Sequence, residues 1–150
     1  MVGTKTDRRA RAEHLFRVVS SDRFLQKQGL GNEVPFFICA FDAEDGLSLG
    51  EDREDLIARL SHAGVRVLDI DLYDLSIRIL EDRGIFEQIL EVEAETEKAE
   101  LKELLQGVLD PQAHLIPEIA RHIEEVPHDV IFLSGVGEVY PYLRSHNVLN

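Results

Sequence analysis

The most constraining feature of this chain is a strand-like pattern that runs directly into a helical one. Residues 65–71, Val-Arg-Val-Leu-Asp-Ile-Asp, alternate apolar and polar side chains as a half-covered strand does. Residues at helical spacing then follow up to Gly84, namely Leu72, Leu75, Ser76, Ile79 and Leu80. A strand followed by a helix is the repeating step of α/β proteins, whose parallel strands are joined by right-handed crossovers.

Two other apolar runs have the length and composition of strands. Phe-Phe-Ile-Cys-Ala-Phe follows Pro35 and is apolar on both faces, which predicts a central, covered strand at about 35–42. Val-Ile-Phe-Leu predicts another at about 129–134, besides the one at 65–70. We therefore expect an α/β fold with three layers: a mostly parallel sheet of at least three strands, with helices on both faces.

The remaining segments are predicted to be helical. They are an N-terminal segment at 5–27, a helix that carries Leu56, Ile57 and Leu60, and an extra insert at about 85–109. Asp110 and Pro111 are typical of an N-cap and first helical residue, so they should begin a further helix. The length of 150 residues suits a single α/β domain over 1–150.

Composition narrows the class of protein. Hydrophobic residues make up 44% of the chain and charged residues 30%, which is typical of a globular protein. No apolar stretch approaches the roughly 18 residues of a membrane-spanning helix, so no membrane contact is expected. Without a signal-like start, and with Cys39 as the one cysteine, the sequence favours a cytoplasmic protein without disulfides.

The net charge of -13 disfavours nucleic-acid binding. The charge is nevertheless uneven: residues 5–27 hold seven basic and three acidic side chains, and residues 81–103 hold three basic and nine acidic ones. Either segment is explained by a solvated helix face or by a charge-steered protein partner, or the two could face each other. Direct contact with nucleic acid is expected, if at all, only through the basic N-terminal helix.

Carboxylates follow the predicted strands, where ligands gather in parallel sheets. Asp42, Asp69 and Asp71 could bind Mg²⁺ and serve a phosphohydrolase or nuclease, because hard cations prefer carboxylate oxygens. The simpler interpretation is that such acids cap helices, as Asp71 would do directly before Leu72. We expect no resident cofactor.

The turn Ser-Gly-Val-Gly-Glu at residues 134–138 superficially resembles a phosphate loop. It lacks the lysine of a P-loop, and Tyr140 stands where a dinucleotide-binding turn needs a small residue. Glu138 would also repel a phosphate. A degenerate ATPase-like domain that keeps some affinity for nucleotides remains as a third hypothesis, but the turn is more typical of a structural corner.

Three stretches carry a family resemblance: GLGNEVPFFICAFD, GVRVLDIDLYDLSIRILEDRG and VIFLSGVGEVYPYLRSHNVLN. In this order and spacing they resemble the BrxB-like family of BREX bacteriophage-exclusion systems, long catalogued as a domain of unknown function. The resemblance covers roughly residues 15 to 150. Its most specific residues are Gly135, Gly137, Tyr140, Pro141, Arg144, Ser145, His146 and Asn147.

The resemblance implies a non-enzymatic component of an assembly that blocks phage replication. It implies as partners an alkaline-phosphatase-like PglZ protein and the large ATPase of the same system. Family members usually continue past residue 150 into another apolar strand, which implies a truncated or shortened member, or a domain cut from a longer protein. An uncovered strand edge would then favour partner contact or self-association.

We expect partner binding at the C-terminal turn, because tyrosine and arginine dominate the energetics of protein interfaces. The alternative is ordinary packing, with Tyr140 in the core and Arg144 paired with an acid. The predicted partner-binding residues are Gly135, Gly137, Tyr140, Pro141, Tyr142, Arg144 and His146.

Overall fold

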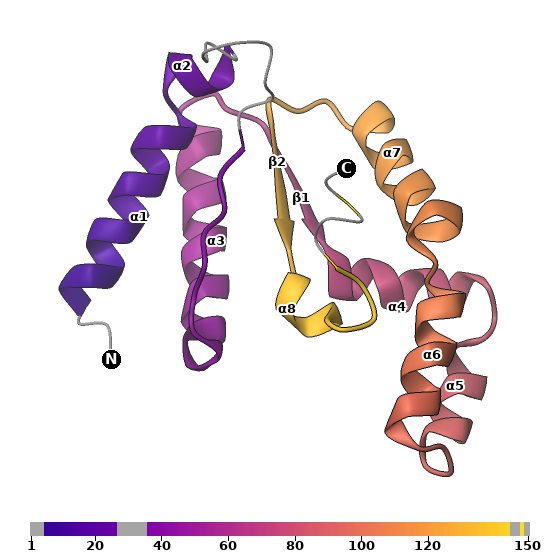
Figure 1. The fold of residues 1–150 in the computed structure, drawn as a ribbon. Helices are drawn as coiled ribbons and strands as arrows, with labels where there is room; N and C mark the ends of the chain where they lie inside the picture. Colours follow the sequence, from indigo (N-terminus) through magenta and orange to yellow (C-terminus); the bar gives the residue numbers. More distant parts are fainter. Residues whose placement is uncertain (1–4, 27–35, 145–147, 149–150) are drawn as a thin grey trace. The chain divides into compact units, whose positions relative to one another are not determined.

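The chain forms two compact units in the computed structural model. The structure describes residues 5–26, 36–144 and 148, and Figure 1 draws the remaining residues as a grey trace. Unit 1 comprises Met1–Val67 and His128–Val130, and unit 2 comprises Leu68–Pro127 and Ile131–Asn150. The single domain expected from the sequence stays a prediction. Each unit is described separately below.

Unit 1 consists mainly of helices. Helix α1 (Lys5–Val19) packs against α3 (Gly46–His62), while the short helix α2 (Asp22–Leu25) and the 3₁₀ turn η1 (Ala43–Asp45) follow α1 and precede α3. The helical segment expected at 5–27 is therefore present in two pieces. The buried apolar residues of unit 1 are Val19, Leu56, Leu60, Val65 and Val130.

The basic side of α1 is partly occupied by acids of α3. Arg8 donates from Nε to Asp52 Oδ1 at 2.7 Å and from Nη2 to Glu51 Oε2 at 3.1 Å. Arg11 Nη2 lies 3.5 Å from the other oxygen of Asp52, and Arg59 of α3 forms a two-pronged pair with Glu13 of α1. Hydrogen bonding from Arg8 lowers the pKa of the Asp52 carboxyl. A solvated basic face, one of the explanations open from the sequence, is therefore an incomplete description of α1.

The strand predicted at 35–42 is absent from its described part, residues 36–42. The chain there has no regular secondary structure, and the side chains of Phe36, Phe37, Ile38 and Phe41 are 49–79% exposed. Phe37 has one aromatic neighbour, Phe24, with ring centroids 5.5 Å apart. An apolar, β-prone composition indicates that the side chains suit a pleated sheet surface. A strand also needs a neighbouring strand whose backbone pairs with its own.

The other two predicted strands are confirmed. β1 (Val67–Asp71) and β2 (Val130–Ser134) form a two-stranded parallel sheet (Figure 1). The described chain is thus mostly helical with a small parallel sheet, and the expected three-layer arrangement around three or more strands is not confirmed. Leu68 and Ile70 of β1 are buried while Asp69 between them is exposed, as the alternating sequence predicts.

An ion pair fixes the start of this sheet. Arg66 donates from Nη2 to Asp129 Oδ1 at 2.9 Å, from Nε to Asp129 Oδ2 at 3.0 Å and from its backbone N–H to the same oxygen at 2.8 Å. The backbone N–H of Asp129 in turn donates to the Arg66 carbonyl at 2.8 Å. The bonds that Arg66 donates to the carboxylate, first from its side chain and then from its backbone N–H, lower the pKa of Asp129 to about 2.

This pair predicts a specific dependence of stability on pH. Because the pKa of Asp129 is lower in the folded state than the unfolded value of about 3.9, its contribution is complete above that value and is lost as the pH falls towards 2. Asp129→Asn should therefore lower the free energy of unfolding at pH 7 and flatten its decline between about pH 4 and pH 2. Urea unfolding of the wild type and of Asp129→Asn across this pH range measures the effect. Free energies of unfolding that fall in parallel with pH for the two proteins would contradict the prediction.

In unit 2, five helical elements separate β1 from β2. α4 (Leu72–Asp82) begins directly after β1, and α5 (Phe86–Glu93) and α6 (Lys98–Val108) confirm the predicted insert at 85–109. A π-helical turn, η2 (Pro111–Leu115), leads into α7 (Ile116–Glu125). Asp110 caps this turn as predicted, by accepting a hydrogen bond from the N–H of Ala113 at 3.0 Å.

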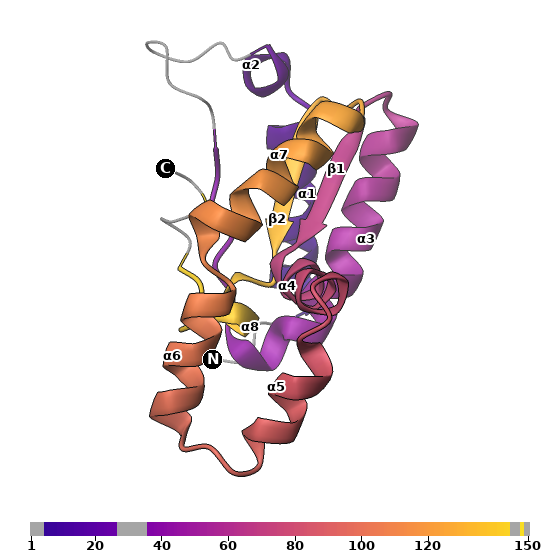
Figure 2. The same cartoon turned by 90° about the vertical axis from the view of Figure 1, so that its right-hand side faces the viewer.

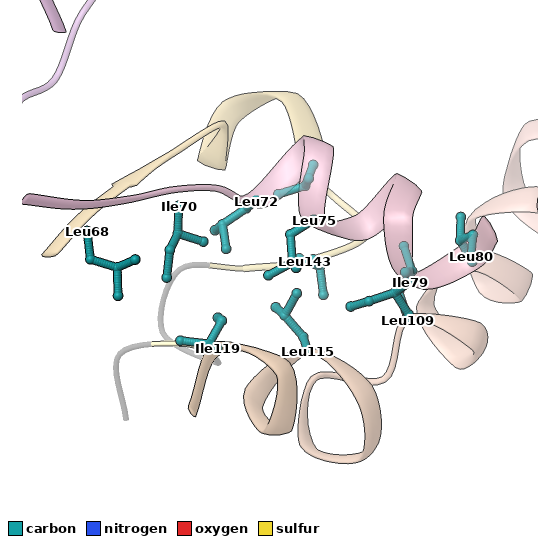
Figure 3. Packing of buried hydrophobic residues seen from close by; sticks show 11 residues of the cluster. Leu68, Ile70, Leu72, Leu75, Ile79, Leu80, Leu109, Leu115, Ile119 and Leu143 are labelled. Atoms are coloured by element: carbon teal, nitrogen blue, oxygen red, sulfur yellow. The ribbon is translucent and has the colours of Figure 1, made fainter. Parts of the chain in front are cut away.

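The core of unit 2 lies between α4 and the segment formed by η2 and α7. Leu72, Leu75, Ser76, Ile79 and Leu80, the stripe predicted from the sequence, are all buried on α4. They contact the buried side chains of Leu109, Leu115 and Ile119 (Figure 3). Leu143 near the end of the described chain is 1% exposed and lies in the middle of this cluster. The C-terminal stretch is therefore packed into the core of unit 2.

Candidate protein interface at the C-terminal corner

Residues 135–144, which we call the C-terminal corner, begin at a glycine that no other residue could replace without strain. Gly135 follows β2 with φ of 73° and caps the short helix α8 (Val136–Val139). A Cβ at this position would lie 2.4 Å from Oδ1 of Asp71 and 3.0 Å from the backbone nitrogen of Tyr73. The left-handed conformation and the close approach both require glycine.

The group that approaches Gly135 is itself structural. Asp71 is the N-cap of α4, and its Oδ1 accepts hydrogen bonds from the N–H groups of Tyr73 at 2.8 Å and Asp74 at 3.3 Å. This confirms the capping interpretation of Asp71, because the carboxylate satisfies helix N–H groups that have no partner within the helix. The turn at Gly135 is thus a packed junction between β2 and the start of α4.

Three contacts hold the rest of the corner in place. Val139 is 4% exposed and Leu143 1% exposed, and the N–H of Leu143 donates to the carbonyl of Val139 at 3.0 Å. Between them, the carbonyl of Pro141, which follows a cis peptide bond, accepts a hydrogen bond from Gln106 Nε2 of α6 at 3.0 Å. The corner therefore has an inner side that is anchored to the core and to α6.

The outer side of the corner carries two of the predicted interface residues. The side chain of Tyr140 is 62% exposed, and Arg144 is exposed as well. Pro141 and Tyr142 are half-buried and Gly137 is exposed, whereas His146 lies outside the described residues. The packing alternative placed Tyr140 in the core, but its side chain is exposed. That alternative also paired Arg144 with an acid, and no ion pair of Arg144 with another described residue is found.

Sequence reasoning missed a third exposed residue, Tyr73. It lies in the first turn of α4, next to Gly135, and is 45% exposed. The signal was present in the sequence, because Tyr73 falls off the apolar stripe that runs through Leu72, Leu75 and Ile79. An aromatic residue on the polar side of an amphipathic helix is a candidate contact residue.

The acids proposed for a metal site are divided between the two units, with Asp42 in unit 1 and Asp69 and Asp71 in unit 2. Asp71 caps α4, Asp69 is exposed on β1, and Asp42 precedes η1 in unit 1. No group of three or more histidine, cysteine or carboxylate side chains placed to hold a metal ion is found among the described residues.

Cys39, expected within a covered strand, is an exposed free thiol. No described helix is long and apolar enough to cross a bilayer.

Comparison with known proteins identifies two relatives of this chain. The chain is 26% identical over 144 residues to a BREX protein BrxB of Bacillus cereus (strain H3081.97), with 93% of this chain and 74% of that protein covered. It is 28% identical over 132 residues to a BREX protein BrxB of Escherichia coli O9:H4 (strain HS), with 88% and 65% covered. The chain thus spans about two thirds to three quarters of the length of these relatives. No solved structure matches it.

A family model described as BREX protein BrxB matches residues 68–150. The match begins at Leu68, the residue at which unit 2 begins, and includes the whole C-terminal corner. It covers more than half of the chain and agrees with the resemblance seen in the sequence motifs. The chain therefore belongs to the BrxB family of BREX proteins.

Proposed function

We propose that this protein is a non-enzymatic interaction component of a BREX phage-defence system and that it binds other proteins of that system through the C-terminal corner. The observation that carries the proposal is the two-sided construction of the corner. Val139 and Leu143 are buried, while Tyr140 between them, and Arg144 after them, are exposed. Family membership supplies the system in which the partners are to be sought.

Such a corner suits binding for a physical reason. Association costs free energy when loops and long side chains become ordered at an interface. Here the backbone of the corner is already held by the Gly135 junction, by Gln106 and by two buried side chains. The free-energy cost of ordering this segment on binding is therefore smaller. Tyrosine and arginine also provide large contact areas and directional hydrogen bonds, and they are enriched among residues that dominate binding energy.

We infer two partners, the PglZ-like protein and the large ATPase, from the family. Neither needs a catalytic group of this chain, since an adaptor contributes only surface and position. Tyr73 extends the proposed surface onto the first turn of α4, because its backbone nitrogen adjoins Gly135. We therefore include Tyr73 with Tyr140 and Arg144 as contact residues.

Co-purification tests this proposal. A tagged wild-type protein, expressed with the neighbouring gene products of its system, should recover one or both partners. Tyr140→Ala/Arg144→Ala should reduce the recovered amount at least tenfold, because both contact residues are lost while the buried anchors remain.

A matched control removes the same kinds of side chain elsewhere. Leu47 is 85% exposed and Arg17 is exposed, both in unit 1, so Arg17→Ala/Leu47→Ala deletes one large side chain and one guanidinium outside the corner. This variant should recover the partners as the wild type does. Wild-type recovery by Tyr140→Ala/Arg144→Ala would rule out the corner as the binding surface.

A further inference from the structure

The α5–α6 hairpin is built differently from the rest of unit 2. Its two helices carry eight large apolar residues, yet none of them is buried, whereas α4 alone has five buried residues. Half of the eight pack partly against the core: Phe86, Ile89, Leu105 and Val108. The other half do not belong to that cluster: Leu90, Val92, Leu101 and Leu104.

The two helices that carry these residues extend away from the rest of unit 2. Both views show α5 and α6 running away from β1, β2 and α7 to a loop at their far end (Figure 2). The side chains of Leu90, Val92 and Leu104 are 46%, 40% and 40% exposed. The base of the hairpin, in contrast, is fixed, because the Arg83 guanidinium donates to the Val108 carbonyl. A helical hairpin whose base is fixed and whose leucines are not buried is typical of a helix-docking surface.

The charge of the hairpin is also uncompensated. Residues 87–103 contain seven glutamates and two lysines, a net charge of -5. None of these glutamates forms an ion pair with another described residue of unit 2. Acids elsewhere do form such pairs, as Asp52 does with Arg8 and Glu118 does with Arg121.

Unit 1 shows what kind of partner this combination of charge and apolar surface takes. Helix α3, with acids beside Leu56 and Leu60, packs against a basic helix, α1, whose Arg8 and Arg11 pair with Asp52. The hairpin presents similar chemistry, exposed leucines among glutamates, and no described helix of unit 2 pairs with these glutamates. We propose that the α5–α6 hairpin is a second docking surface and that its occupant is a lysine- or arginine-rich amphipathic helix of a partner protein. This proposal does not rest on the C-terminal corner.

The probe for this proposal is a synthetic 18-residue helix of leucine and lysine with one apolar face, compared with a leucine and glutamate peptide of the same pattern. Isothermal titration calorimetry of the 150-residue protein should detect binding of the basic peptide and none of the acidic one. Leu90→Ser/Leu104→Ser and Glu91→Gln/Glu95→Gln/Glu103→Gln should each weaken binding at least tenfold, because both apolar contact and opposite charge are required.

The control separates a built site from general attraction to an acidic protein. Glu44, Glu54 and Glu124 are exposed outside the hairpin, so Glu44→Gln/Glu54→Gln/Glu124→Gln removes the same charge and should weaken binding less than twofold. Tyr140→Ala/Arg144→Ala should bind the peptide as the wild type does, which makes this test independent of the proposed corner. Equal weakening by both glutamate variants, full binding by the leucine variant, or no binding by the wild type would overturn the proposal.

Discussion

Gly135→Ala is expected to destabilise the protein by about 2–3 kcal/mol. A left-handed conformation costs an alanine about 1–2 kcal/mol, and loss of an N-cap costs typically about 1 kcal/mol. Both apply here because φ is 73° and the added Cβ would lie 2.4 Å from the Asp71 oxygen that caps α4. Chemical denaturation monitored by circular dichroism measures the change.

Gly137→Ala is the matched control for this substitution. Gly137 is two residues away in α8, has no positive φ, and has no atom within 4 Å of where its Cβ would lie. Alanine is also the better helix former, so the change should alter stability by less than about 1 kcal/mol. Equal effects of the two substitutions would show that the contact of Gly135 with the Asp71 cap contributes nothing.

Leu143→Ala is expected to cost about 2–4 kcal/mol and also to weaken partner binding. The side chain is 1% exposed among Leu75, Ile79 and Leu115, so its removal leaves a cavity in the core of unit 2 (Figure 3). Because Leu143 also anchors the corner, its loss should release Tyr140 and Arg144 from their fixed positions. The measurements are the free energy of unfolding and the recovery of partners in the same pull-down.

A leucine of the hairpin provides the comparison for this prediction. Leu90 is 46% exposed, so Leu90→Ala removes the same atoms without opening a cavity and should cost less than about 1 kcal/mol. A loss of stability from Leu143→Ala no larger than that from Leu90→Ala would mean that the C-terminal stretch is not packed as described.

The sequence predicted best those elements whose signals are local. The stripe through Leu72, Leu75 and Ile79 predicted α4, and Asp110 with Pro111 predicted the start of η2, because spacing and capping act over a few residues. The strand predicted at 35–42 failed for the opposite reason. Its formation depends on a neighbouring strand that composition does not reveal, and its described part is unpaired.

The same distinction holds for the candidate interface. Tyr140 and Arg144 were identified because they belong to a family motif, and the capping role of Asp71 followed from its position before Leu72. The contact between Gly135 and Asp71 joins residues 64 positions apart, which no local pattern encodes. The pairing of Arg8 with Asp52 across 44 residues escaped prediction for the same reason.

The central claim is that the outer side of the C-terminal corner touches a partner, and site-specific photo-crosslinking tests it most directly. A benzophenone amino acid at position 140, where the side chain is 62% exposed, should crosslink to a protein of the BREX system when the components are expressed together. The same group at position 47, which is 85% exposed in unit 1, serves as the control and should give no such product. A crosslinked partner from position 140 alone is the predicted result. Crosslinks from position 47 and none from position 140 would contradict the account.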